Sequence, residues 1–174
     1  MRESTYKAVL SWLSNRPLVL KYFKIFHRLI DFTFFVLYVL MIIFLIFSVT
    51  AASGNERIKN IYLLIKITVL PMLTLISVTI IKMYINQKRP YEVYDITPLF
   101  EIKKRNDSFP SRHTVCASVI AVSFLYMNTG LGIAMIFFAL TIAACRVISG
   151  MHFIKDVLAS VFLGCFIGMF IFIL

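Results

Sequence analysis

Two residues near the end of the chain are spaced for nucleophilic chemistry. His152 and Asp156 are four residues apart in the stretch CRVISGMHFIKD, so their side chains share one face of a helix. A carboxylate one turn from a histidine can hold the imidazole in one tautomer and raise its nucleophilicity. An Asp–His pair with a purely structural role has the same spacing, so the pair alone leaves both interpretations open.

A second histidine stands at the start of an apolar segment. His113 closes the stretch FPSRH, in which Ser111 is suited to cap the helix that follows. The unpaired N–H groups at a helix N-terminus attract anions, and an imidazole just inside can donate or accept a proton near neutral pH. Simple capping beside a structural histidine would explain the same residues.

Three basic residues complete the set. Lys82 and Arg89 are seven residues apart, about two helical turns, so both can point the same way before Pro90 ends the helix. Arg146 closes a later apolar run. Basic residues also flank membrane segments for reasons unconnected with catalysis. Taken together, however, these cations could clamp a phosphate.

Long apolar segments carry these residues. The chain of 174 residues is 60% hydrophobic, with a mean hydropathy of +0.89, which is more than a soluble core needs. Apolar runs suited to membrane helices cover residues 30–53, 61–81, 114–127, 131–145 and 153–174. The sequence therefore predicts an all-α, polytopic transmembrane bundle of about five spans, or six if the N-terminal segment also crosses.

The N-terminal segment is amphipathic. Its basic residues alternate with apolar ones, which is typical of one or two interfacial helices broken near Pro17. We accordingly divide the chain into an interfacial segment, residues 1–29, and a transmembrane domain, residues 30–174. His27, beside Arg28, is interpreted as an interfacial residue.

The order of the spans brings the candidate residues together. With a surface-lying N-terminal segment and five spans, the chain changes sides at each span. Lys82, His113, Arg146 and His152 then lie at the same membrane face. The charged stretch from Pro90 to Pro110 lies there too, and long charged loops often carry functional groups. The sequence thus predicts one site.

These residues resemble the three signature motifs of the type-2 phosphatidic acid phosphatase family of membrane lipid phosphatases, in order and spacing. They are Lys82 with Arg89-Pro90, then Pro110-Ser111 with His113, then Arg146 with His152 and Asp156. The chain departs from the family pattern at Arg112, usually glycine, and at Cys145, often serine. We interpret both as adjustments of substrate or rate, since every titrating and cationic position is present. The small chain looks like the compact bacterial type.

The resemblance implies a phosphatase that uses no metal or cofactor and forms a phosphohistidine intermediate. His152 would attack phosphorus, oriented by Asp156, and His113 would protonate the leaving oxygen and then activate water. Phosphate-binding roles fall to Lys82, Arg89, Ser111, Arg112 and Arg146. The sequence also lacks a carboxylate cluster suited to a metal.

The expected substrate is a lipid phosphate whose tail stays in the bilayer: phosphatidate, phosphatidylglycerophosphate or undecaprenyl diphosphate. The sequence does not choose among these, nor does it indicate an oligomeric state. Lys103, Lys104 and Arg105 either meet a second phosphate or form a solvated charge run. The chain has a net charge of +10, and its basic residues flank membrane segments. This position points to lipid headgroups and not to nucleic acid as their partner.

We expect a multi-pass protein of the cell membrane. The resemblance implies a site on the extracytoplasmic face, whereas the positive-inside rule, applied to the N-terminal bases, favours the cytoplasmic face. The alternative function is that of a catalytically inactive membrane protein, a scaffold or a binder of lipid phosphates. Such a protein would not need His152 or Asp156.

Overall fold

The computed structural model describes residues 3–100 and 107–173, and within these ranges the chain folds into helices without strands. The helices are α1 (Glu3–Ser14), α2 (Pro17–Ala51), α3 (Gly54–Ile85), α4 (Pro90–Val93), α5 (Arg112–Met127), α6 (Thr129–Ile148) and α7 (Ile154–Ile173). The basic run Lys103–Arg105 lies outside the described residues, so its two interpretations stay open.

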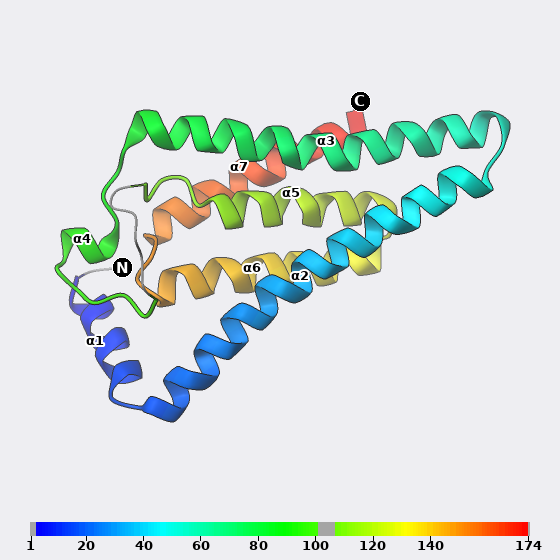
Figure 1. The fold of residues 1–174 in the computed structure, drawn as a ribbon. Helices are drawn as coiled ribbons and strands as arrows, with labels where there is room; N and C mark the ends of the chain where they lie inside the picture. Colours follow the sequence, from blue (N-terminus) through cyan, green and yellow to red (C-terminus); the bar gives the residue numbers. More distant parts are fainter. Residues whose placement is uncertain (1–2, 101–106, 174) are drawn as a thin grey trace.

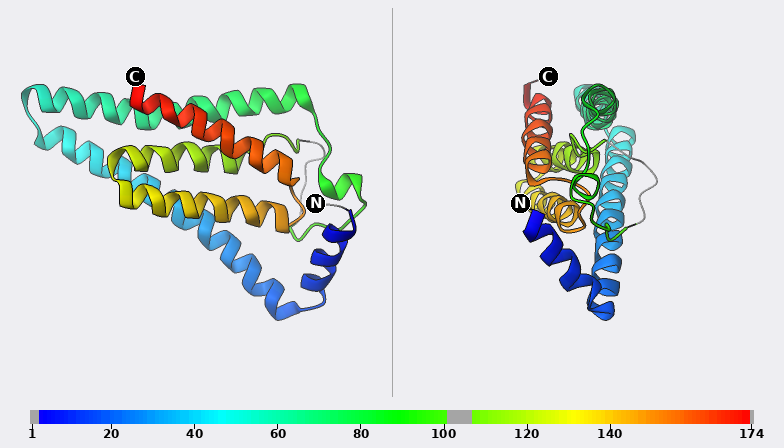
Figure 2. Two further views of the ribbon diagram at one scale, coloured as in Figure 1. Left: turned by 180° about the vertical axis from the view of Figure 1, so that it is seen from behind. Right: turned by 90° about the vertical axis from the view of Figure 1, so that its left-hand side faces the viewer.

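Helices α2, α3, α6 and α7 are long and apolar enough to cross a membrane. The fifth long helix, α5, has 16 residues and is apolar, and it packs against α3, α6 and α7 at the centre of the bundle (Figures 1 and 2). Its length of about 24 Å is less than the thickness of the hydrocarbon core. The predicted all-α, multi-pass transmembrane bundle is confirmed.

The N-terminal segment differs in part from its prediction. A break does separate α1 from α2, and Pro17 occupies the first turn of α2, where its missing N–H costs nothing. Beyond it, α2 runs unbroken from Pro17 to Ala51, because that stretch contains no further proline and no glycine. Residues 17–29 therefore belong to the same helix as the first span. The functional division at residue 29 stays a prediction.

All the candidate site residues lie at one end of the bundle, as the order of spans predicts. There α3 and α6 end, α5 and α7 begin, and α4 packs close to α1 (left in Figure 1). Helix α1 lies across this end and buries Tyr6, Leu10 and Leu13. The described parts of the connection between α3 and α5, residues 86–100 and 107–111, lie on the same side and supply much of the site.

Small residues set the distance between α5 and α7. A Cβ on Gly164 would lie 2.5 Å from the carbonyl oxygen of Val115 and 2.6 Å from Cβ of Ser118. A Cβ on Gly168 would meet the side chain of Val122 in the same way, one turn further along α7. Such glycines let the backbones of membrane helices approach closely. Because α7 carries Asp156 and α5 carries His113, this crossing fixes the two halves of the site relative to each other.

We predict that Gly164→Ala pushes α5 away from α7 and destabilises the protein by about 1–3 kcal/mol, the usual cost of overpacking. Thermal unfolding in detergent measures this effect. The control is Ala144→Val, which adds carbon to an exposed position of α6. Equal unfolding temperatures for the Gly164→Ala variant and the wild type would contradict the proposed close packing.

Candidate active site

His152 lies in the short connection between α6 and α7. Gly150, with a φ of +74°, makes the turn that precedes it, and the N–H group of His152 donates to the carbonyl oxygen of Arg146 at 3.3 Å. The imidazole is 4% exposed. Its Nδ1 lies 2.7 Å from the carbonyl oxygen of Ser108. Because a carbonyl can only accept, Nδ1 carries the proton, which leaves a lone pair on Nε2.

The hydroxyl of Tyr6 holds the backbone of this connection from the other side. It donates to the carbonyl oxygen of His152 at 3.0 Å. Burial, with smaller contributions from Tyr94 and Asp156, raises the pKa of Tyr6 to about 12. The hydroxyl thus stays protonated and remains a donor, so that α1 helps to fix the histidine.

Asp156 reaches the imidazole indirectly. The sequence predicts a direct contact with His152, but the buried carboxylate instead accepts hydrogen bonds from the hydroxyl of Ser108, the N–H of Phe153 at 3.2 Å and the side-chain amide of Gln87 at 3.3 Å. Ser108 therefore stands between the two residues: its hydroxyl binds Asp156, and its carbonyl oxygen orients His152. His152 precedes the first residue of α7, so the two side chains do not share the helix face that the spacing predicts, and the loop before α5 comes between them.

Three cations lie near enough to the imidazole for their charges to act on it. Lys82, Arg89 and Arg146 are each less than a tenth exposed. Burial, followed by the positive charges of Arg89 and Lys82, holds the pKa of His152 well below its ordinary value, and the hydrogen bond from Nδ1 to Ser108 opposes this only in part. A low pKa favours the neutral imidazole, with a free lone pair on Nε2.

The prediction that Lys82 and Arg89 share one helix is wrong. Helix α3 ends at Ile85, because Asn86 takes a left-handed conformation with a φ of 45°, and Pro90 begins α4 instead of ending α3. Arg89 lies in the segment between them. The two cations nevertheless converge, and the ammonium of Lys82 donates to the carbonyl oxygen of Asp107.

Ser111 occupies the N-cap position of α5 as predicted, but its hydroxyl makes no capping hydrogen bond. The hydroxyl accepts from Oγ1 of Thr114 at 3.0 Å, and the backbone N–H of Ser111 donates to Oγ of Ser160 on α7 at 2.7 Å. Ser111 thus ties α5 to α7. Arg112 follows it, is half-buried, and lies close enough for its charge to act on Lys82.

His113 is exposed at the first turn of α5 and borders a cavity of about 180 Å³ between α2, α5 and α6. Apart from His113 and Asp31, the cavity is lined mainly by apolar and aromatic side chains: Phe34, Phe35, Tyr38, Cys116, Ala117, Ile120 and Ile142. The charge of Arg146 acts on His113 as it does on His152. Both histidines therefore lie within electrostatic range of the same guanidinium.

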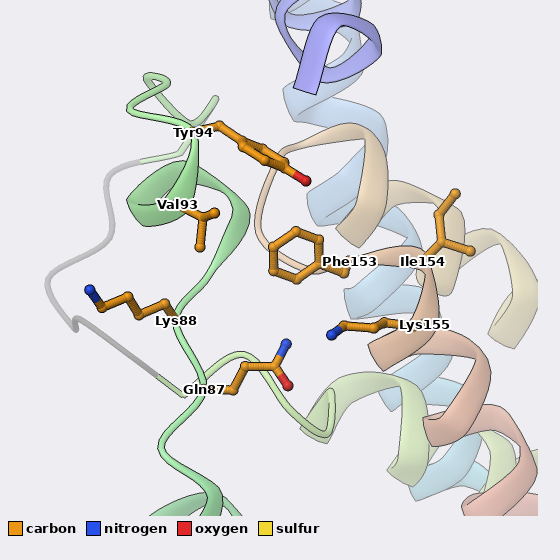
Figure 3. A pocket seen from close by; sticks show the side chains of 7 residues that line it. All are labelled: Gln87, Lys88, Val93, Tyr94, Phe153, Ile154 and Lys155. Carbon is orange, nitrogen blue, oxygen red and sulfur yellow. The ribbon is translucent and has the colours of Figure 1, made fainter. Parts of the chain in front are cut away.

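A larger cavity, of about 540 Å³, opens beyond the residues that hold Asp156. It is lined by Gln87, Lys88, Val93, Tyr94, Phe153, Ile154 and Lys155. Figure 3 shows the side chains of Lys155 and Gln87 extending into it below the ring of Phe153. Neither His113 nor His152 lines this cavity, so it is not where the two histidines could meet a reacting group.

Sequence reasoning missed two residues of α2. One carboxylate oxygen of Asp31 accepts from Nη2 of Arg146 at 2.6 Å, and Nδ1 of His27 lies 3.7 Å from the same oxygen. His27 is 5% exposed and packs against Phe100, with ring centroids 4.6 Å apart, so it is not an interfacial residue. The available signal was Asp31 itself, a carboxylate in an apolar run one turn from a histidine.

Ser108, Gln87 and Ser160 were also missed, and nothing in the sequence singles them out.

The described residues contain no cluster of metal ligands. Among residues 3–100 and 107–173, no group of three or more His, Cys, Asp or Glu side chains could hold an ion. Independence from metal stays a prediction.

Comparisons with known proteins identify the family and the fold. A protein-family model described as the PAP2 superfamily matches residues 62–174. A transmembrane PAP2-type phosphatidylglycerolphosphate phosphatase from Bacillus subtilis superimposes with a TM-score of 0.68 at 22% identity, over 97% of this chain and 81% of that one. LpxE of Aquifex aeolicus gives 0.62 at 23% identity, over 94% and 92%. At such identities the two structures support the fold. A comparison with curated protein sequences finds no match.

We predict that His152 remains neutral at pH 6. Its folded-state pKa lies below the value of about 6.5 in the unfolded chain, so the unfolded chain binds the proton first on acidification. Its contribution to stability is therefore complete above pH 6.5 and is lost as the pH falls toward the folded-state pKa. Histidine-selective NMR in detergent, assigned with a His152→Gln variant, measures the midpoint.

Replacing Arg89 with glutamine should raise this midpoint, because a cation near the imidazole is removed. Arg57→Gln is the matched control, since Arg57 is exposed at the start of α3, at the opposite end of the bundle. A wild-type midpoint at or above 6.5 contradicts the prediction.

Proposed function

Because the chain belongs to the PAP2 superfamily, we propose that it removes a terminal phosphate from a lipid at one face of the membrane through a covalent intermediate on His152. Membership makes the chain a hydrolase of phosphoric ester bonds. The observation that carries the proposal is a buried imidazole, fixed at Nδ1 by Ser108 and surrounded by three buried cations. This arrangement matches a nucleophile beside an anion.

Substrate binding uses positive charge. Lys82, Arg89 and Arg146 would contact the non-bridging oxygens of the phosphate, and the first-turn N–H groups of α5 would add hydrogen bonds. Such contacts are strongest where water is excluded, and the low exposure of the three cations meets that condition. Ser111 would keep the start of α5 aligned with α7, and Arg112 would add a further contact.

In the first step Nε2 of His152 attacks phosphorus, and the bond between phosphorus and the lipid oxygen breaks. His113 donates a proton to that oxygen as it leaves. The phosphohistidine that forms keeps the proton on Nδ1, which donates it to the carbonyl oxygen of Ser108. Asp156 holds Ser108 in place through the Ser108 hydroxyl. Asp156 and Ser108 thus favour the positive charge that develops on the ring.

In the second step the now neutral His113 accepts a proton from water, whose oxygen attacks phosphorus. The bond between phosphorus and Nε2 breaks, and inorganic phosphate leaves with the histidines restored. The three cations neutralise the negative charge of the phosphate, a task that a metal ion performs in other phosphoryl-transfer enzymes. The nearby carboxylates of Asp31 and Asp156 already have partners, which supports a mechanism without metal.

The substrate is a lipid because the apolar cavity beside His113 opens between α2 and α5, which can admit a hydrocarbon tail. The proposed substrates are phosphatidate, phosphatidylglycerophosphate and undecaprenyl diphosphate. One protein of similar structure is described as a phosphatidylglycerolphosphate phosphatase, which makes that lipid the first to test.

The test of this function is phosphate release by purified protein in detergent from a panel of these lipids. We expect turnover at the same rate with and without EDTA, and a loss of about a thousandfold or more in His152→Ala. The control Ser123→Ala removes a buried hydroxyl that bonds only within α5, and it should keep full activity. EDTA inhibition reversed by magnesium would overturn the metal-free mechanism.

The covalent step has its own signature in the same assay. His113→Asn should slow lipid hydrolysis by about 10²–10⁴-fold. An aryl phosphate, whose leaving group needs no proton, should still phosphorylate this variant, and the acid-labile phosphohistidine should accumulate. Binding of lipid phosphate without turnover by the wild type would instead support the inactive binding protein or scaffold.

We also propose that the site faces outside the cytoplasm, as the family resemblance implies. Labelling of intact cells with a membrane-impermeant maleimide tests this. Cysteine at exposed Thr97, at the site end, should react, whereas cysteine at exposed Asn55, at the opposite end, should react only after lysis. The reverse pattern would place the site in the cytoplasm, as the N-terminal bases suggest.

A further inference from the structure

The guanidinium proposed to bind phosphate already has an anion beside it. Arg146 donates from Nη2 to Asp31 at 2.6 Å, across 115 positions of sequence. Asp31 belongs to α2, which carries none of the three family motifs. Its carboxylate also lines the cavity beside His113, so it faces the space that the substrate would enter.

This pair differs from an ordinary buried ion pair in its exposure and in its unfilled contacts. The side chain of Arg146 is 5% exposed, whereas that of Asp31 is 31% exposed and so borders open space. Within the part of the chain that the structure describes, Nε of Arg146 is buried without a hydrogen-bond partner. A buried donor without a partner is costly, and an arriving phosphate oxygen could satisfy it.

His27 offers the carboxylate a second position. Its Nδ1 lies 3.7 Å from the same oxygen that binds Arg146, one helical turn earlier on α2. Its Nε2 is likewise buried without a partner among the described residues. Asp31 can therefore move toward His27 when a phosphate oxygen takes its place on Arg146, and the carboxylate remains partnered in both states.

We propose that Asp31 is a resident anion, a positioning residue that holds Arg146 ready in the free enzyme and weakens the binding of inorganic phosphate so that the product leaves. The inference rests on the phosphate-binding role of Arg146 in the proposed function. A phosphate dianion together with Asp31 and Asp156 balances the charges of Lys82, Arg89, Arg112 and Arg146. Without the charge of Asp31, the occupied site keeps an excess positive charge, and the product is held more tightly.

The experiment measures binding and turnover separately in the Asp31→Asn variant. Asparagine keeps the shape of the side chain and an oxygen that can accept from Arg146, but it removes the charge. Calorimetry of the purified protein with inorganic phosphate should give a Kd lower by about tenfold or more. In the lipid phosphatase assay, KM should fall and kcat should fall with it, because product release becomes slower.

A merely structural Asp31 predicts the opposite result, because a loosened Arg146 would bind phosphate more weakly. An unchanged or raised Kd therefore overturns the inference. Glu56→Gln is the control for net charge, since it removes one exposed carboxylate at the far end of α3 and should leave the Kd unchanged. If Asp31→Asn fails to fold, Asp31→Ser removes the same charge and carries the same expectation.

The two proposals fail separately. Lipid hydrolysis by the wild type with no tightening of phosphate in the Asp31 variants overturns the resident anion and leaves the proposed function standing. The opposite result is a wild type that hydrolyses no lipid, with Asp31 variants that bind inorganic phosphate more tightly than it does. That result overturns the proposed function and supports Asp31 as the residue that limits anion affinity.

Discussion

Three positive charges held out of water at one end of the bundle are the constraint on which the rest of the site depends. A buried cation is costly unless neighbouring groups compensate it. The carbonyl oxygen of Asp107 does this for Lys82, and the carboxylate of Asp31 does it for Arg146. The residues that meet this requirement come from α2 and from the loop before α5, which explains why the site reaches well beyond the residues that would do the chemistry.

The same charges determine the state of His152. An imidazole among cations loses its proton readily, so burial and positive charge act together to keep Nε2 free. The structure then needs a fixed acceptor for Nδ1, and it uses a backbone carbonyl, which cannot itself take up the proton. The hydroxyl of Ser108 on Asp156 and the hydroxyl of Tyr6 on the histidine backbone hold this arrangement from opposite sides.

How much the sequence could predict follows from the range of each interaction. Runs of apolar residues and the order of spans are local or additive properties, so the bundle and the convergence of Lys82, Arg146 and the histidines could be predicted. The partner of Arg146 could not, because it lies 115 residues away on a helix that carries no motif. The bridge through Ser108 depends on the path of a loop, and the end of α3 depends on the left-handed conformation of Asn86.

The charge of the site also bears on the choice among membrane lipids. Ordinary phospholipids, which surround any such protein, are phosphodiesters with one negative charge and two non-bridging oxygens. A terminal phosphate has three such oxygens and up to two charges. Three buried cations beside the first turn of a helix match the second kind of group better than the first. As the proposed resident anion, Asp31 would sharpen this difference, because a monoanion that must displace a carboxylate from Arg146 gains less than a dianion does. In the proposed function, selection of terminal phosphates would thus follow from the balance of charge at the end of the bundle, before any contact with the lipid tail.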